Sequence, residues 1–327
     1  MSKVLSGPLP MNTPLVTPLD PSLRLEQHDD TALSLHFGDL ELFRYVYRSD
    51  AYPEEAPRPY FHPLRSLEGD VMTNFRPNNH PWHHGLSLTM NNVSGANFWG
   101  GPSYHEDGYQ WRGDWGRQSH VEWRVQEASG NRARLEEVLE WTHHDEVIFR
   151  EERRIGIAVN SPEKVWTLRW RSTLTNASSH DLTLSNPGTY GLEGMHYGGL
   201  TFRGTRDFFD SYLDSTLKIT AGNFGDPDGV NAPFKGGEQA NGACADWVEF
   251  RGQFDGSLRH LHIRFANHTG PLRWFVLPKM EMVCFSPHAT SSLDLPRGEA
   301  LELDHSLSFA CAPGSLRVRS FVDQNQA

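Results

Sequence analysis

Residues 121–175 have the sequence VEWRVQEASGNRARLEEVLEWTHHDEVIFREERRIGIAVNSPEKVWTLRWRSTLT. Apolar and polar side chains alternate along most of this stretch, which is the period-two pattern of half-buried β-strands. Three short interruptions mark turns, at Gly130-Asn131, at His143-His144-Asp145 and at Asn160-Ser161-Pro162. The pattern therefore predicts an antiparallel meander of long strands.

The same alternation continues on both sides of the meander. Further strands are predicted at 33–37, 40–49, 70–75, 86–91, 181–185, 245–252, 260–266, 272–277 and 301–310. The chain shows no sustained helical stripe, no repeat period and no alternation of strands with helices. We therefore expect an all-β fold, a large antiparallel β-sandwich whose long loops rim a concave sheet.

The chain has 327 residues. Because large sandwiches fold as one unit, we expect residues 22–327 to form a single domain. Residues 1–21 contain five of the prolines and are predicted to be an extended N-terminal arm. No apolar signal segment interrupts that arm, so a cytoplasmic location is expected.

Composition excludes several classes of partner. Acidic residues outnumber basic ones by 41 to 30, a formal charge of −11, whereas nucleic-acid binders carry a basic stripe. No apolar run is long enough for a membrane span. The three cysteines are widely spaced, which argues against a disulfide framework or a thiolate zinc site. A small polar molecule is the expected partner, while assembly into a homo-oligomer stays open.

The reactive side chains concentrate in the segment Asn79-His80-Pro81-Trp82-His83-His84-Gly85. Prolines at 77 and 81 each fix φ and lack a donor, so this segment is predicted to be a rigid loop. The imidazole pKa lies close to neutrality, and such a loop therefore suits proton transfer or metal binding.

Several short motifs surround that loop. They are P-Y-x-x-P-L-R at 59–65, G-x-V-x-T at 69–73, H-P-x-H at 80–83, V-S-G-x-N-F-W at 93–99 and Y-G-G-L-x-x-R at 197–203. Together they resemble the bacterial domain-of-unknown-function 6807 family, often labelled "methane oxygenase PmoA". That label conflicts with a polar chain that has no membrane span.

The resemblance implies a galactose-mutarotase-like supersandwich that binds sugars and presents histidines and a carboxylate for acid–base chemistry. It favours His80 and His83 as the catalytic pair. Asn79 stands where the family more often has Asp, and His84 falls at a variable position. Tyr197 and Arg203 belong to the last of the motifs, and the resemblance carries them as substrate-binding residues.

An acidic partner for the histidines is predicted at Glu152 or at Glu193. Glu151 and Glu152 are neighbours on one strand, so only one of them can face the site. The complete set of predicted substrate-binding residues is His62, Arg65, His84, Trp99, His120, Tyr197 and Arg203.

The leading hypothesis is a carbohydrate-active enzyme without a cofactor, acting by epimerisation or mutarotation, or by cleavage or elimination of a glycoside. A second hypothesis places a divalent metal ion on His80, His83 and His120 in a sugar hydrolase or lyase. A third is a sugar-binding protein without catalysis. Nucleophilic catalysis is not indicated, because there is no G-x-S-x-G motif.

Overall fold

The computed structural model describes residues 21–208, 218–222, 240–270 and 272–311. Apart from Pro21, the arm predicted at residues 1–21 lies outside the described residues. Within those residues the helical segments are short 3-10 turns, and no helix is long and apolar enough to cross a membrane. The predicted all-β class is confirmed.

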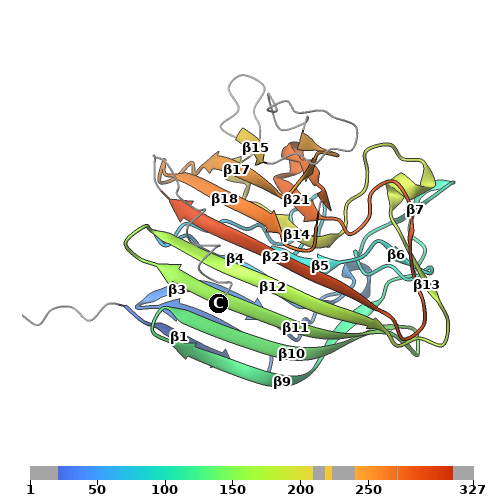
Figure 1. Cartoon of the computed structure of the whole chain (residues 1–327), viewed down its shortest axis with the longest axis horizontal. Helices are drawn as coiled ribbons and strands as arrows, with labels where there is room; N and C mark the ends of the chain where they lie inside the picture. Colours follow the sequence, from blue (N-terminus) through green and yellow to red (C-terminus); the bar gives the residue numbers. More distant parts are fainter. Residues whose placement is uncertain (1–20, 209–217, 223–239, 271, 312–327) are drawn as a thin grey trace, which may run out of the picture.

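Two eight-stranded antiparallel sheets pack face to face (Figure 1). The long-strand sheet contains, in spatial order, β15 (Lys218–Gly222), β17 (Trp247–Gln253), β18 (His260–Asn267), β23 (Ala300–Cys311), β12 (Val165–Asn176), β11 (Glu146–Asn160), β10 (Arg132–His143) and β9 (Arg117–Ser129). The short-strand sheet contains β1 (Leu23–His28), β2 (Ala32–Phe37), β3 (Leu40–Val46), β4 (Tyr60–Leu64), β5 (Leu86–Thr89), β14 (Gly199–Arg203), β21 (Met282–Phe285) and β20 (Phe275–Leu277).

Three small sheets extend this sandwich. They are β22 (Leu293–Leu295) with β13 (Leu182–Ser185) and β6 (Asn92–Val93), β16 (Cys244–Ala245) with β19 (Leu272–Arg273), and β7 (Ser103–His105) with β8 (Gly108–Gln110). The β7–β8 hairpin belongs to the irregular segment that follows Trp99 in the sequence.

The predicted meander is confirmed: β9, β10, β11 and β12 are neighbours in chain order. The three turns fall at residues 130–131, 144–145 and 161–164, as the sequence pattern indicates. The strand predicted at 70–75 is wrong. There the backbone makes only isolated bridges, because Val71, Thr73 and Phe75 each pair with a different segment.

Aromatic side chains fill the space between the two large sheets. Phe61 of β4 lies 6.0 Å from Trp170 of β12, and Phe202 of β14 lies 5.4 Å from Phe265 of β18, measured between ring centroids. All four side chains are fully buried. Burial of this apolar surface holds one sheet on the other.

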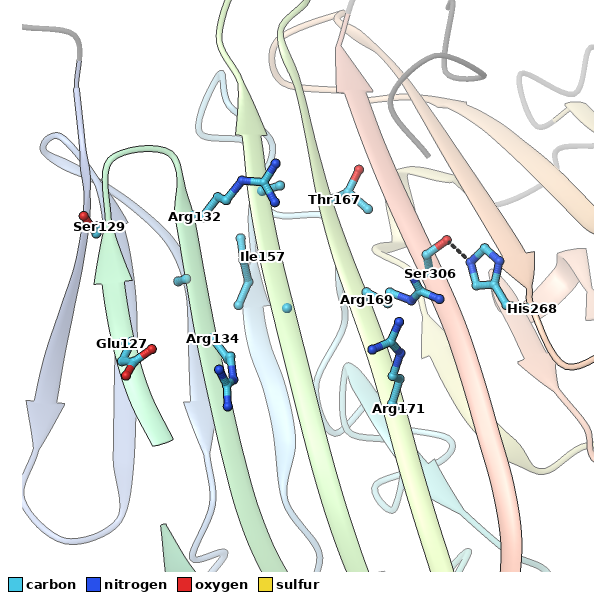
Figure 2. A pocket seen from close by; sticks show the side chains of 13 residues that line it. Glu127, Ser129, Arg132, Arg134, Ile157, Thr167, Arg169, Arg171, His268 and Ser306 are labelled. Atoms are coloured by element: carbon cyan, nitrogen blue, oxygen red, sulfur yellow. Dashed lines mark hydrogen bonds between the residues drawn. The ribbon is translucent and has the colours of Figure 1, made fainter. Parts of the chain in front are cut away.

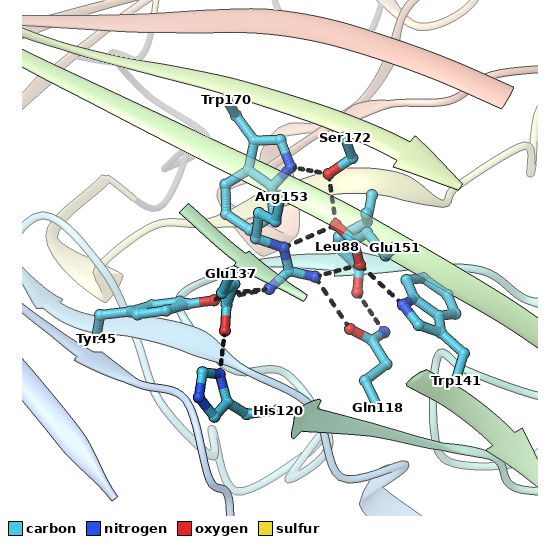
Figure 3. Close-up of polar contacts among 10 residues, drawn as sticks. All are labelled: Tyr45, Leu88, Gln118, His120, Glu137, Trp141, Glu151, Arg153, Trp170 and Ser172. Carbon is cyan, nitrogen blue, oxygen red and sulfur yellow. Dashed lines mark hydrogen bonds and ion pairs between the residues drawn. The ribbon is translucent and has the colours of Figure 1, made fainter. Parts of the chain in front are cut away.

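One charged network is enclosed in the same core (Figure 3). The guanidinium of Arg153 on β11 donates to both carboxylate oxygens of Glu151, at 2.8 and 2.7 Å, and lies 3.6 Å from Glu137 of β10. Its Nη1 also donates to the hydroxyl of Tyr45 on β3, at 2.8 Å. Although burial alone would lower the pKa of Arg153, these partners raise it above its ordinary value. The network therefore connects the two sheets through a permanently charged group.

A second branch of the network reaches the strand after the histidine loop. Arg153 donates to Gln118 of β9 at 3.4 Å, and the Gln118 amide donates to the carbonyl of Leu88 on β5 at 2.9 Å. His120 of β9 bonds Glu137 at 2.8 Å (Figure 3). These contacts fix β5 relative to the long-strand sheet.

Substitution of Arg153 tests the role of this network. Arg153→Met leaves the carboxylates of Glu137 and Glu151 buried without their cation, so we expect the free energy of unfolding to fall by about 3–5 kcal/mol. The measurement is urea unfolding followed by tryptophan fluorescence. Arg154→Met is the matched control, because Arg154 is exposed on the opposite face and its loss should change stability by less than about 0.5 kcal/mol. Equal unfolding midpoints for the two variants would contradict this role.

Candidate functional site

The histidine segment forms a compact loop on the short-strand sheet. The amide of His80 donates to the Pro77 carbonyl at 2.9 Å, and the amide of His83 donates to the His80 carbonyl at 3.0 Å. Gly85 ends the loop with φ of +48°, and a Cβ there would lie 2.1 Å from the Phe61 carbonyl oxygen. Only glycine fits this position, which directs the chain into β5.

A buried arginine, Arg58, stabilises the loop through hydrogen bonds. Arg58 donates to the carbonyls of Glu55, Ala56 and Trp82, at 2.7, 3.0 and 2.6 Å, and to the Ser87 hydroxyl at 3.1 Å. Its pKa is lowered to about 10 by burial. The guanidinium thus satisfies loop carbonyls that would otherwise be buried without a donor.

His84 belongs to this support rather than to an open site. Its Nε2 donates to the carboxylate of Glu55 at 2.7 Å, and Arg76 binds the same carboxylate through two contacts of 2.7 and 2.8 Å. Burial lowers the pKa of His84 to about 4, so its imidazole is neutral at pH 7. Burial alone would raise the pKa of Glu55, but the hydrogen bonds from His84 and Arg76 lower it to about 2.

Above the loop lies an apolar cavity of about 240 Å³. Its lining comes from the histidine loop, the two irregular segments after Trp99 and before β14, and strands β20 and β21. These residues are His80, Trp82, His83, Trp99, Pro102, Tyr109, Met195, Tyr197, Phe275, Leu277, Met280 and Met282. We call this cavity the aromatic pocket.

The two histidines face each other within the pocket wall. Their rings stack at 4.9 Å between centroids, and the edge of His83 meets Trp99 at 5.3 Å. Trp99 in turn contacts Tyr197 at 4.6 Å, and the hydroxyls of Tyr197 and Tyr109 are 2.8 Å apart. The pocket therefore combines aromatic faces with two hydroxyls and two imidazoles.

Both pocket histidines are uncharged at neutral pH. Burial lowers the pKa of His80 and His83, and the positive charge of Arg203 lowers them further. The Nδ1 atoms of both rings are buried, and neither has a hydrogen-bond partner among the described residues. A neutral imidazole can accept a proton on a ring nitrogen that a ligand reaches.

A buried ion pair lies close to the histidines. Nη2 of Arg203 is 3.3 Å from Oε2 of Glu281, and both side chains are almost fully enclosed. Burial raises the pKa of Glu281 to about 7. Glu281 has a left-handed backbone, with φ of +45°, between Met280 and Met282 of the pocket wall. A non-glycine residue in this conformation is strained, and such strain often accompanies functional sites.

Four of the predicted site residues line the pocket, and two support it. The lining four are His80, His83, Trp99 and Tyr197. Arg203 and His84 are buried close to the pocket histidines but are absent from its lining. Glu281 and Tyr109 were missed, because nothing local in sequence links them to the histidine loop.

The remaining predicted residues lie elsewhere. Glu152 faces outward from β11 and bonds Arg124 at 3.0 Å, because its neighbour Glu151 takes the core-facing position. Glu193 is exposed two residues before Met195 and does not line the pocket. The structure thus brings neither predicted carboxylate to the histidines.

Three basic residues are also separate from the pocket. His62 bonds Thr73 at 3.0 Å and stacks on Phe75. Arg65 donates to the carbonyl of Gly69 at 3.3 Å. His120 is bound to Glu137 in the core and so does not join His80 and His83. Across the described ranges, no group of three His, Cys, Asp or Glu side chains is placed to hold a metal ion.

Comparison with known proteins gives one match over most of the chain. Residues 32–315 match the model of a family described as "Family of unknown function (DUF6807)". No curated protein matches the chain.

Solved structures show only distant likenesses. The GH36 alpha-galactosidase AgaB of Geobacillus stearothermophilus is 11% identical over 90% of this chain and 41% of its own, with a TM-score of 0.39. A putative kojibiose phosphorylase from the human microbiome is 6% identical over 94% of this chain and 32% of its own, with a TM-score of 0.33. The Slr1438 protein of Synechocystis is 13% identical over 93% of this chain and 100% of its own, with a TM-score of 0.35. This chain therefore spans less than half the length of the first two, and similarity at this level supports no inference about function.

Removal of the Glu55 carboxylate tests the support beneath the loop. Glu55→Ala leaves His84 and Arg76 without their shared acceptor, so we expect stability to fall by about 3 kcal/mol at pH 7. Because the folded pKa of Glu55 lies below its ordinary 4.5, this advantage of the wild type should shrink as the pH falls from 4.5 towards 2. Urea unfolding at several pH values measures both effects. The exposed neighbour Glu54 provides the control, Glu54→Ala, and a pH-independent difference for Glu55→Ala would contradict the assignment.

Proposed function

The chain belongs to the DUF6807 family of unknown function, and we propose that it is a carbohydrate-active enzyme in which His80 and His83 move a proton on a sugar held in the aromatic pocket. The observation that carries this proposal is the pair of stacked, neutral imidazoles in the wall of an otherwise apolar cavity.

The composition of the pocket suits a sugar ring. Aromatic faces bind the C–H faces of sugars, and Trp99 and Tyr197 present such faces beside His83. The hydroxyls of Tyr109 and Tyr197 can bond to substrate hydroxyls. Apolar walls with a few placed polar groups are the usual design of small-molecule sites.

Proton transfer is the chemistry that these side chains support. A neutral imidazole is a competent base at neutral pH, and its lowered pKa keeps it in that form down to mildly acidic conditions. One neutral imidazole can accept a proton from the substrate, and the imidazolium that forms can then return that proton. This suits epimerisation, mutarotation or elimination, in which a proton leaves and re-enters the substrate.

Hydrolysis by a carboxylate pair is less well supported. That mechanism needs two Asp or Glu residues flanking the glycosidic bond. Among the described residues that line the pocket there is no Asp and no Glu. The carboxyl of Glu281 is paired with Arg203 at 3.3 Å and is not part of the pocket lining.

Isotope exchange tests the proposed activity. Wild-type protein incubated in D₂O with a panel of sugars and oxidised sugars should exchange an anomeric or C–H proton of at least one of them, as seen by NMR. His83→Ala should reduce that rate about 100-fold or more, because a positioned acid or base contributes this much. His144→Ala, an exposed turn histidine, is the control and should keep full activity.

Two outcomes would favour the other hypotheses. Sugar binding without exchange by the wild type would identify a non-catalytic sugar-binding protein. Activity that is lost with a chelator and restored by a divalent cation would identify a metal-dependent enzyme.

The charge of Arg203 provides a pH test of the same site. Arg203→Gln removes a positive charge that lowers the pKa of His80 and His83, so both values should rise. The acidic limb of the pH–rate profile should then move to higher pH. NMR titration of the imidazoles is the direct measurement, and the exposed Arg206 provides the control, Arg206→Gln. Unchanged imidazole pKa values in Arg203→Gln would refute the electrostatic assignment.

A further inference from the structure

A second hollow, of about 510 Å³, lies on the outer face of the long-strand sheet (Figure 2). The lining comes from β9, β10, β11, β12 and β23, and from the turn after β18. Its residues are Glu127, Ser129, Arg132, Ala133, Arg134, Gly156, Ile157, Ala158, Thr167, Arg169, Arg171, His268 and Ser306. We call it the arginine basin. It is on the opposite sheet from the aromatic pocket, so the two cannot share one ligand.

Strand register explains the shape of the basin. Gly156 pairs with Arg134 on one side and with Arg169 on the other, so two long side chains flank a position with no side chain. In the next outward-facing row Ala158 pairs with Arg132 on one side and with Thr167 on the other, so the middle position is again small. The floor is therefore low in the middle, and the arginines rise around it (Figure 2).

The local backbone does not require glycine at position 156. Its φ is not in the left-handed region, and a Cβ there would meet only the Cβ of Arg169, at 4.0 Å. Glycine weakens the interior of a strand, and it often marks a place where a ligand approaches the backbone closely. A fifteen-residue strand with a glycine at a half-buried position on its outer face thus points to an occupant.

The charge of the basin points to an anion. Its lining holds four arginines and one glutamate, in a chain whose net charge is −11. A single carboxylate, Asp304, is shared by Arg169 at 2.8 and 2.9 Å and by Arg171 at 3.2 Å. One acid for two guanidiniums leaves donors for a further acceptor, since each fork carries five N–H groups.

We propose that the arginine basin binds a carboxylate-bearing oligosaccharide. Guanidinium forks match carboxylates in geometry, and hydroxyls such as those of Thr167 and Ser306 can bond to sugar hydroxyls. Acidic groups at Glu127, Glu136 and Asp304 remain nearby, which favours singly charged carboxylates over doubly charged phosphates. The volume falls within the range of small-molecule sites, roughly 300–1,000 Å³. This inference does not depend on the chemistry proposed for the aromatic pocket.

Calorimetric titration tests the proposal with three probes: a linear trigalacturonate, the neutral trisaccharide maltotriose and inorganic phosphate. Only the trigalacturonate should bind, and its affinity should fall with added salt. Gly156→Val fills the floor, so affinity should drop about tenfold or more, the effect of losing one good contact. The melting temperature should stay the same or rise, because valine favours a strand.

A matched pair of arginines provides the charge test. Arg134 and Arg154 are both exposed and both lie near Glu136, at 2.9 and 3.9 Å, but only Arg134 lines the basin. Arg134→Gln should weaken binding of the trigalacturonate several-fold, whereas Arg154→Gln should leave it unchanged.

Three results would overturn the assignment. They are absence of trigalacturonate binding, equal binding of maltotriose or phosphate, and an unchanged affinity in Gly156→Val. His83→Ala must keep trigalacturonate affinity, and Gly156→Val must keep any exchange activity of the aromatic pocket. The two sites can therefore fail independently.

Discussion

A guanidinium enclosed between two sheets must be neutralised where it lies, and Arg153 imposes that requirement on the whole sandwich. Its charge persists at any ordinary pH, so Glu151 and Glu137 have to accompany it into the core. Because Tyr45 and Gln118 complete the arrangement from other strands, sliding one sheet against the other would strip the cation of its acceptors. Hydrophobic burial is non-directional, whereas this network fixes one alignment.

Buried charged residues also support the histidine loop. Arg58 and Glu55 are charged and buried, and they satisfy the backbone and the imidazole of a segment that has few regular hydrogen bonds of its own. Gln118 joins the two systems through two hydrogen bonds. Its backbone N–H donates to the carbonyl of Pro57, and its side-chain amide donates to the carbonyl of Leu88. The pocket histidines therefore stand on a base that is connected to the core, which favours a fixed geometry over a mobile one.

Local pattern was sufficient to predict the meander and the loop, but not the contents of the site. Alternation fixes which side chains share a face, but the sequence prediction chose Glu152 for the site, whereas in the structure Glu151 shares the buried face with Ile155 and Ile157. The acid that lies between two residues of the pocket wall is instead Glu281, which is about two hundred residues further along the chain and has no motif around it. Tyr109 and Tyr197 meet only through long-range folding. Histidine is a residue type suited to a functional site, but His120 is hydrogen-bonded to Glu137 of the buried network.

The methionines of the pocket wall make the pocket sensitive to oxidising conditions. Met195, Met280 and Met282 give the cavity soft walls that can adjust to ligands of different outline. Conversion of a thioether to a sulfoxide would place a polar, chiral group against Trp99 and Phe275, in a space built for apolar contact. The same side chains that make the pocket adaptable thus make it sensitive to peroxide, and bound ligand would shield them.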